Sequence, residues 1–486
     1  MKFSIFGLHS IVFACLVLCG CGHSFTARSA TSNNSGLGPQ LADVQIGDQN
    51  GREIPDQFMG LSHEWGDAQA MMGSTSSGGN FAYRNLLRNL TSYGSGPIVI
   101  RIGGNSTDTS RTPLPGALNA FADISRTIGA QFILGVNLGT NDASLAARQA
   151  QGYVKAMPAG SIAAIEIGNE PDLYARQHLR DGVYNFQRYL TEFDTWRRAI
   201  TTAVGPRMRF FGPSWGDLSS LQDTGKFLDA EHAYLYAFSF HYYVGYVSPA
   251  HSNRANLLLS PKASAEASTR VAAAVAAAHS QNVPFRMGEL NSIAGGGQDG
   301  VSNSFEAGLW AIDIMFEYAN VGVDGVNWHT VSHDTYSPFT FSKTFGLLNV
   351  YQIRQVTPLY YGMLFFQAAT GHHSHLRAVQ AHTQLNMKFW ATQDEGGDLR
   401  LVAINKDPQS GYIKVTQPGF HKIVVDRLVA PSFEAKTGVT FDGQTFDGSS
   451  DGLLRGAKHL DQYFPQDGVF EIPISGTSAM IVKFVR

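Results

Sequence analysis

The stretch Ile165-Glu166-Ile167-Gly168-Asn169-Glu170-Pro171-Asp172 joins a short apolar, β-rich run to a polar turn. Similar runs alternate with helical patterns up to about residue 370, which is typical of repeated βα units. Eight such runs span residues 57–63, 98–102, 132–137, 163–167, 209–212, 237–241, 284–288 and 325–329. The helical patterns include residues 81–93, 143–156, 184–204, 264–279 and 304–319. The alternation predicts a (β/α)8 TIM barrel over residues 56–370, with a doubly wound open sheet as the alternative.

The pattern changes after Gly371, where short strands separated by turns replace the βα units. Candidate strands at 399–405, 412–416, 422–428 and 479–485 predict an all-β sandwich over residues 371–486. The stretch 42–53 has the pattern of a strand and turn ahead of the first barrel strand. We expect residues 41–55 to pair with the sandwich, which then takes in an N-terminal strand.

The composition is that of a large globular protein with little surface charge. Of 486 residues, 43% are hydrophobic and only 15% are charged, so the chain is able to bury a sizeable core and is not disordered. The 36 basic and 39 acidic side chains nearly balance. General affinity for nucleic acid or for an anionic membrane needs a basic surface, so both are excluded as main functions. The function must therefore be sought in a local site.

The N-terminus has the features of an export signal. The three cysteines are Cys15, Cys19 and Cys21, so the remaining body has no disulfide framework. A basic start and an apolar run over 11–18 predict a secretory signal peptide over residues 1–20.

Residues 18–21, Leu-Cys-Gly-Cys, further resemble a bacterial lipobox, which implies cleavage before Cys21 and lipidation of that cysteine. Ordinary secretion or a retained anchor is the alternative. Residues 21–40 are rich in Ser, Thr, Asn and Gly and are expected to form a flexible tether. We expect a lipid-anchored protein of the bacterial cell envelope, on the periplasmic or outer-surface side. The anchor is its only expected membrane contact, and the sequence makes no prediction of an oligomeric state.

Two glutamates follow barrel strands. Glu170 comes after the fourth run, and Glu289 ends the seventh in Phe285-Arg286-Met287-Gly288-Glu289-Leu290-Asn291. Side chains at the carboxyl ends of barrel strands converge on one substrate. Glycoside cleavage needs two carboxyl groups, one to protonate the leaving oxygen and one to attack or stabilise the sugar cation. For either glutamate alone, helix capping or pairing with an arginine in the barrel mouth is the competing interpretation.

The motifs around both glutamates resemble the retaining glycosidases of clan A, and more closely glycoside hydrolase family 79, which comprises β-glucuronidases and heparanases. The matching segments are 58–64 (FMGLSHE), 101–105 (RIGGN), 168–171 (GNEP), 240–243 (FHYY), and 288–289 (GE) through the glycines at 295–297. The resemblance covers about residues 41–486. It implies a barrel joined to a β-sandwich that borrows an N-terminal strand.

The resemblance also implies roles for individual residues. Glu289 is the expected nucleophile and Glu170 the expected acid/base of a double displacement. Asn169 is expected to hydrogen-bond the sugar 2-hydroxyl. Arg101 is expected to support the nucleophile or to belong to a structural ion pair.

Four further polar residues have two interpretations each. His241 and Tyr243 share a strand face and are expected to orient Glu289, although burial within the barrel explains either one alone. Glu64 and Asn105 are expected to contact sugar hydroxyls, with loop or helix capping as the alternative.

The loop after Glu289 departs from the family. The family carries a tyrosine directly before the glycine triplet, and its hydroxyl binds the glucuronate carboxylate together with glycine N–H groups. Here Ala294 takes that position, leaving the backbone donors of Gly295 and Gly296. His333 and Tyr336 are possible replacements for a second family tyrosine. Losing one charge-assisted hydrogen bond costs about 1.5–3 kcal/mol, which weakens selection for a uronate without abolishing it.

Other features are assigned to structure. His372, His373 and His375 cluster without a neighbouring cysteine or acidic ligand set in the sequence, so we predict a solvated loop and no metal. No motif indicates a cofactor. Aromatic residues at strand ends are either sugar-stacking platforms or core, and they are Trp65, Trp215 and Trp328.

Together these observations predict a retaining β-glycosidase with a carbohydrate substrate, acting on terminal glucuronic acid. One alternative is a clan A retaining β-glycosidase for a neutral or methylated sugar. A second alternative, from another class, is a catalytically silent carbohydrate-binding lipoprotein. The intact pair Glu170 and Glu289 argues against the second alternative.

Overall fold

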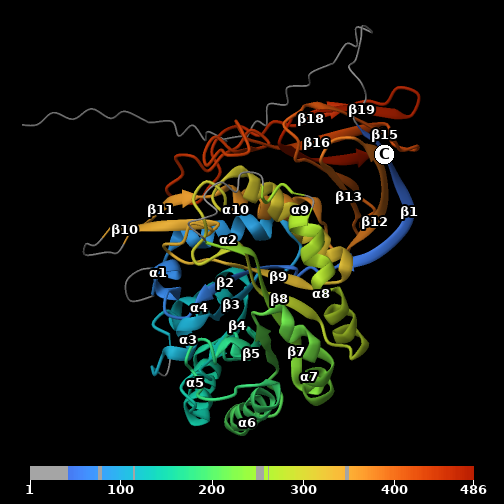
Figure 1. The fold of residues 1–486 in the computed structure, drawn as a ribbon. Helices are drawn as coiled ribbons and strands as arrows, with labels where there is room; N and C mark the ends of the chain where they lie inside the picture. The colour runs from blue at the N-terminus through green and yellow to red at the C-terminus, as the bar shows by residue number, and fades with distance from the viewer. Residues whose placement is uncertain (1–41, 75–78, 113–114, 248–256, 261, 345–349) are drawn as a thin grey trace, which may run out of the picture.

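The computed structural model describes residues 42–486 except 75–78, 113–114, 248–256, 261 and 345–349 (Figure 1). The predicted signal peptide, the tether and Cys21 therefore lie outside the described residues. Among the residues described, no helix combines the length and apolar content that crossing a bilayer requires.

Eight parallel strands close into a barrel, which confirms the predicted (β/α)8 fold. Each strand overlaps one of the apolar runs because those runs are buried on both faces. In chain order the strands are β2 (Met59–Glu64), β3 (Val99–Gly103), β4 (Gln131–Val136), β5 (Ile162–Ile167), β6 (Phe210–Trp215), β7 (Leu235–Tyr246), β8 (Phe285–Ala294) and β9 (Gly325–His329). Strands β7 and β8 extend well beyond the predicted runs, and their pairing continues to Tyr246 and Ala294. They thereby raise one side of the barrel mouth.

Helices surround the barrel, as the sequence periodicity predicts. The longer ones are α2 (Phe81–Tyr93), α4 (Leu118–Ile128), α5 (Ala143–Ala156), α6 (Phe186–Val204), α7 (Thr224–Glu231), α8 (Lys262–Ser280), α9 (Phe305–Val321) and α10 (Pro358–Ala369). Short helical turns lie in the connections: α1 (Ala68–Met72), α3 (Asn105–Thr109), η2 (Pro171–Leu173), η3 (Leu218–Asp223) and η4 (His232–Tyr234).

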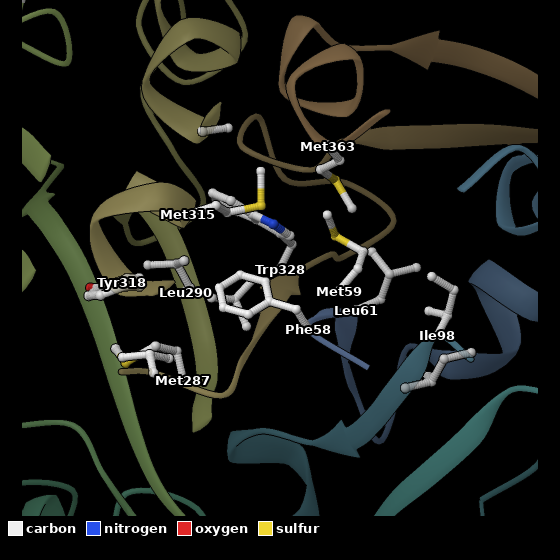
Figure 2. Close-up of a cluster of buried hydrophobic side chains, with 14 of the residues drawn as sticks. Phe58, Met59, Leu61, Ile98, Met287, Leu290, Met315, Tyr318, Trp328 and Met363 are labelled. Carbon is white, nitrogen blue, oxygen red and sulfur yellow. The ribbon is translucent and has the colours of Figure 1, made fainter. Parts of the chain in front are cut away.

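Helices α9 and α10 are apolar on nearly every face because they lie between the barrel and the C-terminal sheet (Figure 1). Figure 2 shows Met315 of α9 and Met363 of α10 pointing towards Met59 and Trp328 of the barrel wall. On the other face of α9, Phe316 stacks on Trp390 of the sheet, with 5.7 Å between ring centroids. One hydrophobic cluster therefore extends from the barrel to residues of the C-terminal sheet such as Val402 and Ile404.

The C-terminal domain is a ten-stranded sheet that curves around its own apolar core. Its order is β17-β16-β20-β14-β13-β12-β1-β15-β19, with β18 paired to β16. The strands are β1 (Ala42–Ile54), β12 (Ser374–Thr383), β13 (Met387–Gln393), β14 (Leu399–Asn405), β15 (Gly411–Thr416), β16 (Lys422–Val429), β17 (Thr440–Phe441), β18 (Asp461–Tyr463), β19 (Val469–Ile474) and β20 (Ser478–Val485). A separate hairpin pairs β10 (Phe339–Thr344) with β11 (Val350–Val356).

The N-terminal strand β1 lies inside this sheet, not at its edge. It pairs antiparallel with β12 and parallel with β15, and thus joins two parts of the sheet. The sequence predicts a strand and turn over 42–53, whereas the structure has one strand with two register shifts in its pairing with β12. Those irregularities account for the polar, turn-like residues near its middle.

The tryptophans proposed as stacking platforms belong to the core. Trp328 is fully buried and its ring centroid lies 5.5 Å from that of Trp310. Trp215 is buried against Phe238, and the Trp65 indole N–H donates to the Tyr153 hydroxyl at 2.9 Å. Of the two interpretations that the sequence left open, the core interpretation is correct.

Candidate active site

A cavity of about 910 Å³ opens at the carboxyl ends of the barrel strands. It brings together ten of the eleven predicted catalytic and substrate-binding residues, namely Glu64, Asn105, Glu170, His241, Tyr243, Glu289, Gly295, Gly296, His333 and Tyr336. The remaining one, Asn169, is buried behind this lining and is only 2% exposed.

Glu170 stands on a tightly constrained turn at the end of β5. Glu170 itself has a φ of 46°, in the left-handed region, and its N–H donates to the Ser214 carbonyl at 3.0 Å. Gly168 also has a positive φ, of 73°, and a side chain there would meet Tyr174 and Leu138 within 2.7 Å. Only glycine fits that position, which explains on steric grounds why the Gly-Asn-Glu-Pro sequence begins with Gly168.

The two catalytic candidates face one another across a short gap. An oxygen of Glu170, a ring nitrogen of His241 and an oxygen of Glu289 all lie within 4.8 Å of one another. Retaining glycosidases hold their two carboxyl groups about 5–5.5 Å apart, whereas inverting ones leave about 6.5–9.5 Å for a water molecule. The spacing is that of a retaining pair.

Arg101 of β3 links several parts of the site through its buried guanidinium. Its Nε donates to both oxygens of Glu166 at 2.9 Å, and its Nη1 donates to Glu289 Oε2 at 2.8 Å and to Ser62 Oγ at 2.9 Å. Its Nη2 donates to Asn169 Oδ1 at 2.7 Å. Arg101 is therefore both a support of Glu289 and a member of a structural ion pair, so the two alternatives drawn from the sequence hold together.

Glu289 is held in its ionised form. The Tyr243 hydroxyl donates to Glu289 Oε1 at 2.6 Å, and His329 Nδ1 lies 3.5 Å from Oε2. Burial alone would raise the pKa of Glu289, but His329, Arg101 and the Tyr243 hydrogen bond together hold it well below its usual range. The carboxylate that an attacking group needs is thus present at neutral pH.

Glu170 is held in its protonated form. Burial and, next, the charge on Glu289 raise the pKa of Glu170 to about 8, against the opposing effect of Arg101. The direct contact of His241 is with this residue, at 3.1 Å from Nδ1 to Oε1, and not with Glu289 as the shared strand face predicts. The expectation is wrong for His241 because Arg101 and Tyr243 already supply the hydrogen bonds of Glu289.

The His241 ring is neutral at physiological pH, since burial lowers its pKa to about 4. The cluster of Glu170, His241 and Glu289 has the residue types of a metal site. The oxygens of Glu289, however, already receive hydrogen bonds from Tyr243 and Arg101, so a guanidinium is the buried cation beside this carboxylate.

On another side of the cavity, Glu64, Asn105 and Asn169 are connected through contacts of their carboxylate and amide groups. Glu64 accepts from the backbone N–H groups of Asn105 at 3.2 Å and Ser106 at 2.9 Å, so it caps α3 while lining the cavity. Asn105 Oδ1 accepts from Asn169 Nδ2 at 2.9 Å. This bond uses one of the two Nδ2 protons of Asn169 and leaves the other for a ligand.

The wall after β8 and β9 is built from two loops. Gly295, Gly296 and Gly297 have φ values of 83°, 92° and 85°, and the Gly296 carbonyl accepts from the Thr335 N–H at 2.7 Å. Tyr336 is buried and its hydroxyl interacts with both Asp334 and Tyr243. The His333 side chain is 76% exposed at the rim, so the two residues proposed to replace a family tyrosine occupy different environments.

Three residues of the site were missed in the sequence analysis. Glu166 is the inward-facing charge within the apolar run of β5, an irregularity that could have identified it as a partner of a buried cation. His329 ends the β9 run, a position of the same kind as that of Glu289. Asp334 lies between His333 and Tyr336, the two predicted replacements for a family tyrosine. The sequence gives no sign that its carboxylate lines the cavity, as it does in the structure.

The histidine cluster lies away from the cavity, beside the start of the C-terminal sheet. His372 Nδ1 lies 2.5 Å from Asp56 Oδ2, and His373 Nδ1 lies 2.6 Å from Glu53 Oε1. The side chains of His372 and His373 are exposed, as expected for a solvated loop, whereas His375 is half-buried and belongs to strand β12. The premise that no acidic group accompanies the histidines is wrong, because β1 and the residues after it supply the carboxylates from far away in the sequence.

Comparison with known proteins agrees with this geometry. Residues 378–481 match the model of the glycosyl hydrolase family 79 C-terminal beta domain. A beta-glucuronidase of Neurospora crassa is 26% identical over 82% of this chain and 86% of its own length. A beta-glucuronidase of Aspergillus niger is 25% identical over 64% of each chain.

The C-terminal domain thus matches family 79, and most of the chain is similar to beta-glucuronidases. The resemblance inferred from the motifs is thereby confirmed, and the protein is a glycoside hydrolase. The 4-O-alpha-L-rhamnosyl-beta-D-glucuronidase of Fusarium oxysporum has the same fold, with a TM-score of 0.73 and 20% identity over 90% of this chain and 99% of that one. A GH51 arabinofuranosidase of Xanthomonas axonopodis, with a TM-score of 0.69 and 14% identity over 92% and 100% of the two chains, shares the fold more distantly.

The pKa of Glu170 predicts an alkaline limit to activity. Because Glu170, the expected proton donor, has a pKa of about 8, kcat/KM for an aryl β-glycoside should fall as the pH rises through that value. A pH series measured with Glu170→Gln and an activated leaving group should lack this limb, because the glutamine does not ionise. An alkaline limb that persists in the variant would assign the titration to another group.

Proposed function

We propose that this glycoside hydrolase cleaves terminal β-glucuronides by double displacement with retention of configuration. The observation that carries the proposal is the gap of at most 4.8 Å between carboxyl oxygens of opposite protonation state, one on Glu170 and one on Glu289. An ionised nucleophile and a protonated acid at this distance are what a retaining mechanism requires.

In the first step, Glu289 attacks the anomeric carbon while Glu170 gives its proton to the leaving oxygen. A glycosyl ester forms on Glu289, and the leaving alcohol departs. In the second step, Glu170 takes a proton from water, which attacks the same carbon and releases Glu289. The proton on Glu170 is thereby restored, and two inversions give net retention.

Residues around the pair stabilise the charge changes. Arg101 and Tyr243 donate to Glu289 and orient its free lone pair towards the cavity, which lowers the entropy loss on attack. The remaining N–H of Asn169 is directed to the sugar 2-hydroxyl, where a hydrogen bond strengthens as the ring gains positive charge. Glu64 and Asn105 contact the neighbouring hydroxyls from the same side of the cavity.

The proposed sugar is glucuronic acid because the two curated relatives are named beta-glucuronidases and the Fusarium neighbour is named a glucuronidase. The N–H groups of Gly295 and Gly296 border the cavity and are the proposed donors to the uronate carboxylate. A neutral or methylated sugar is the second candidate, favoured by the small side chain of Ala294 on the same wall.

Retention is tested directly on the enzyme. Proton NMR of the reaction with an aryl β-glucuronide should show the β-anomer of the sugar as the first product, before mutarotation. Glu289→Gln should lower kcat by about a thousandfold or more, since it removes the nucleophile while keeping side-chain size. A first product with the α configuration would contradict double displacement, and full activity of Glu289→Gln would exclude Glu289 as nucleophile.

The sugar is tested with a panel of aryl β-glycosides: glucuronide, galacturonide, glucoside, galactoside and xyloside. The glucuronide should have the highest kcat/KM. A neutral sugar preferred by about tenfold, equivalent to roughly 1.4 kcal/mol of transition-state binding, would overturn the uronate assignment. Absence of hydrolysis across the panel would instead favour the silent carbohydrate-binding lipoprotein.

We also propose that the protein is a lipoprotein of the bacterial cell envelope, cleaved before Cys21 and lipidated there. The support is the apolar run over 11–18 followed by Leu18-Cys19-Gly20-Cys21. The polar tether over 21–40 separates the enzyme from the membrane surface.

The anchor is tested by expression in a bacterium with a labelled fatty acid. The wild-type protein should take up label and sediment with membranes, and Cys21→Ser should lose both properties. Cys19→Ser, two residues away, is the matched control and should keep the label. Label retained in Cys21→Ser would contradict the assigned anchor.

A further inference from the structure

Asp334 lies in the cavity wall and takes no part in the mechanism described above. Its side chain is only 17% exposed, and its Oδ1 lies 3.5 Å from Nε2 of His333 at the rim. A methyl group built on Gly296 would lie 3.2 Å from that same Oδ1. A carboxylate therefore stands directly beside the glycine backbone donors.

The geometry of the reacting pair decides which part of the sugar meets this wall. The anomeric carbon must lie between Glu170 and Glu289, and the 2-hydroxyl lies on the side of Asn169, which follows β5. In a pyranose ring, C5 lies across the ring oxygen from C1, away from C2. Strand β9 is four strands from β5 in the closed eight-stranded barrel, on its opposite side. The substituent on C5 therefore points to the loops that follow β8 and β9.

The charges on this wall oppose one another. The N–H groups of Gly295 and Gly296 favour an anion, whereas Asp334 repels one. Asp334 is also connected to the reaction centre, because the hydroxyl of Tyr336 interacts with both Asp334 and Tyr243, and Tyr243 donates to Glu289. A carboxylate bound on this wall would lie near the Asp334 side chain, which is only 17% exposed, so solvent screens the repulsion less than at the open rim.

We propose that Asp334 is the specificity-determining residue for the C5 substituent, weakening the binding of a free carboxylate relative to a neutral group. A neutral group that donates a hydrogen bond, such as a hydroxymethyl, finds an acceptor in Asp334. The inference rests on the proposed function in one respect, since it needs a β-glycoside in the cavity. Beyond that function, the inference names Asp334 as the residue that determines the relative affinity for a uronate and for a neutral sugar.

The test compares an aryl β-glucuronide with its methyl ester, because the two differ in charge and keep the same ring. Asp334→Asn should raise the ratio of kcat/KM for the acid to that for the ester by about tenfold or more. An aryl β-glucoside, which carries a hydroxymethyl, should show no such gain. The isosteric amide keeps the shape of the wall, so the change reports on charge.

Two further variants separate this effect from a general change in cavity charge. Glu266→Gln removes a negative charge from the same cavity on α8, where the side chain is 50% exposed and 3.7 Å from Arg270. Screening by solvent should keep its acid-to-ester ratio within about twofold of wild type. Ala294→Tyr adds a hydroxyl donor to the wall and should raise the ratio while Asp334 remains.

An acid-to-ester ratio unchanged in Asp334→Asn, or raised equally in Glu266→Gln, would overturn the proposal. If the wild-type enzyme hydrolyses none of the three glycosides, the proposed function fails. Calorimetric titration with glucuronic acid and with its methyl ester then measures the acid-to-ester ratio of binding affinities instead of the ratio of kcat/KM. That titration also decides the outcome if Asp334→Asn binds the sugars but loses turnover.

Discussion

The site depends on one buried cation, the guanidinium of Arg101. A charge removed from water needs compensation, and here two carboxylates, a hydroxyl and an amide oxygen all accept from it. Burial would lower the pKa of Arg101, but Glu166 and Glu289 hold it above its ordinary value, so the side chain is charged. Since these partners come from β2, β5, β8 and the turn after β5, the same contacts fix the relative positions of four elements of the barrel mouth.

The protonation states of the two glutamates follow from this arrangement. Glu289 lies against the cation and stays ionised, while Glu170 contacts a neutral histidine and carries the raised pKa of about 8. Two carboxyl groups this close do not both ionise readily, because the charge on the first disfavours the second. His329, Arg101 and the Tyr243 hydrogen bond lower the pKa of Glu289, so Glu170 is the one that keeps the proton, which is the basis of the proposed roles of nucleophile and acid.

The barrel strands could be predicted because each apolar run is buried on both faces and is bounded by polar turns. Glu170 and Glu289 could be predicted because position at a strand end is a property of the local sequence. The direct partner of His241 could not, since it depends on which oxygens of Glu289 are already engaged by other strands. Asp334 was missed for a related reason. Its place in the cavity wall depends on its closeness to Gly296, which lies almost forty residues earlier in the chain.

The two sides of the cavity differ in how they are held. Glu289 lies on a strand and contacts the fully buried Arg101, and Glu170 lies on a strand-end turn held by Ser214 and His241, so their geometry leaves little freedom. The wall that faces C5 consists of two loops joined by the bond between Thr335 and Gly296, with three consecutive glycines at positive φ. Substitution of Ala294, at the end of β8, or of Asp334, in the loop after β9, is expected to change which sugar fits while the hydrogen bonds of Glu289 to Arg101 and Tyr243 stay in place. Sugar preference can therefore change at the rim of the cavity, while the connection from Asp334 through Tyr336 and Tyr243 to Glu289 links this rim to the reaction centre.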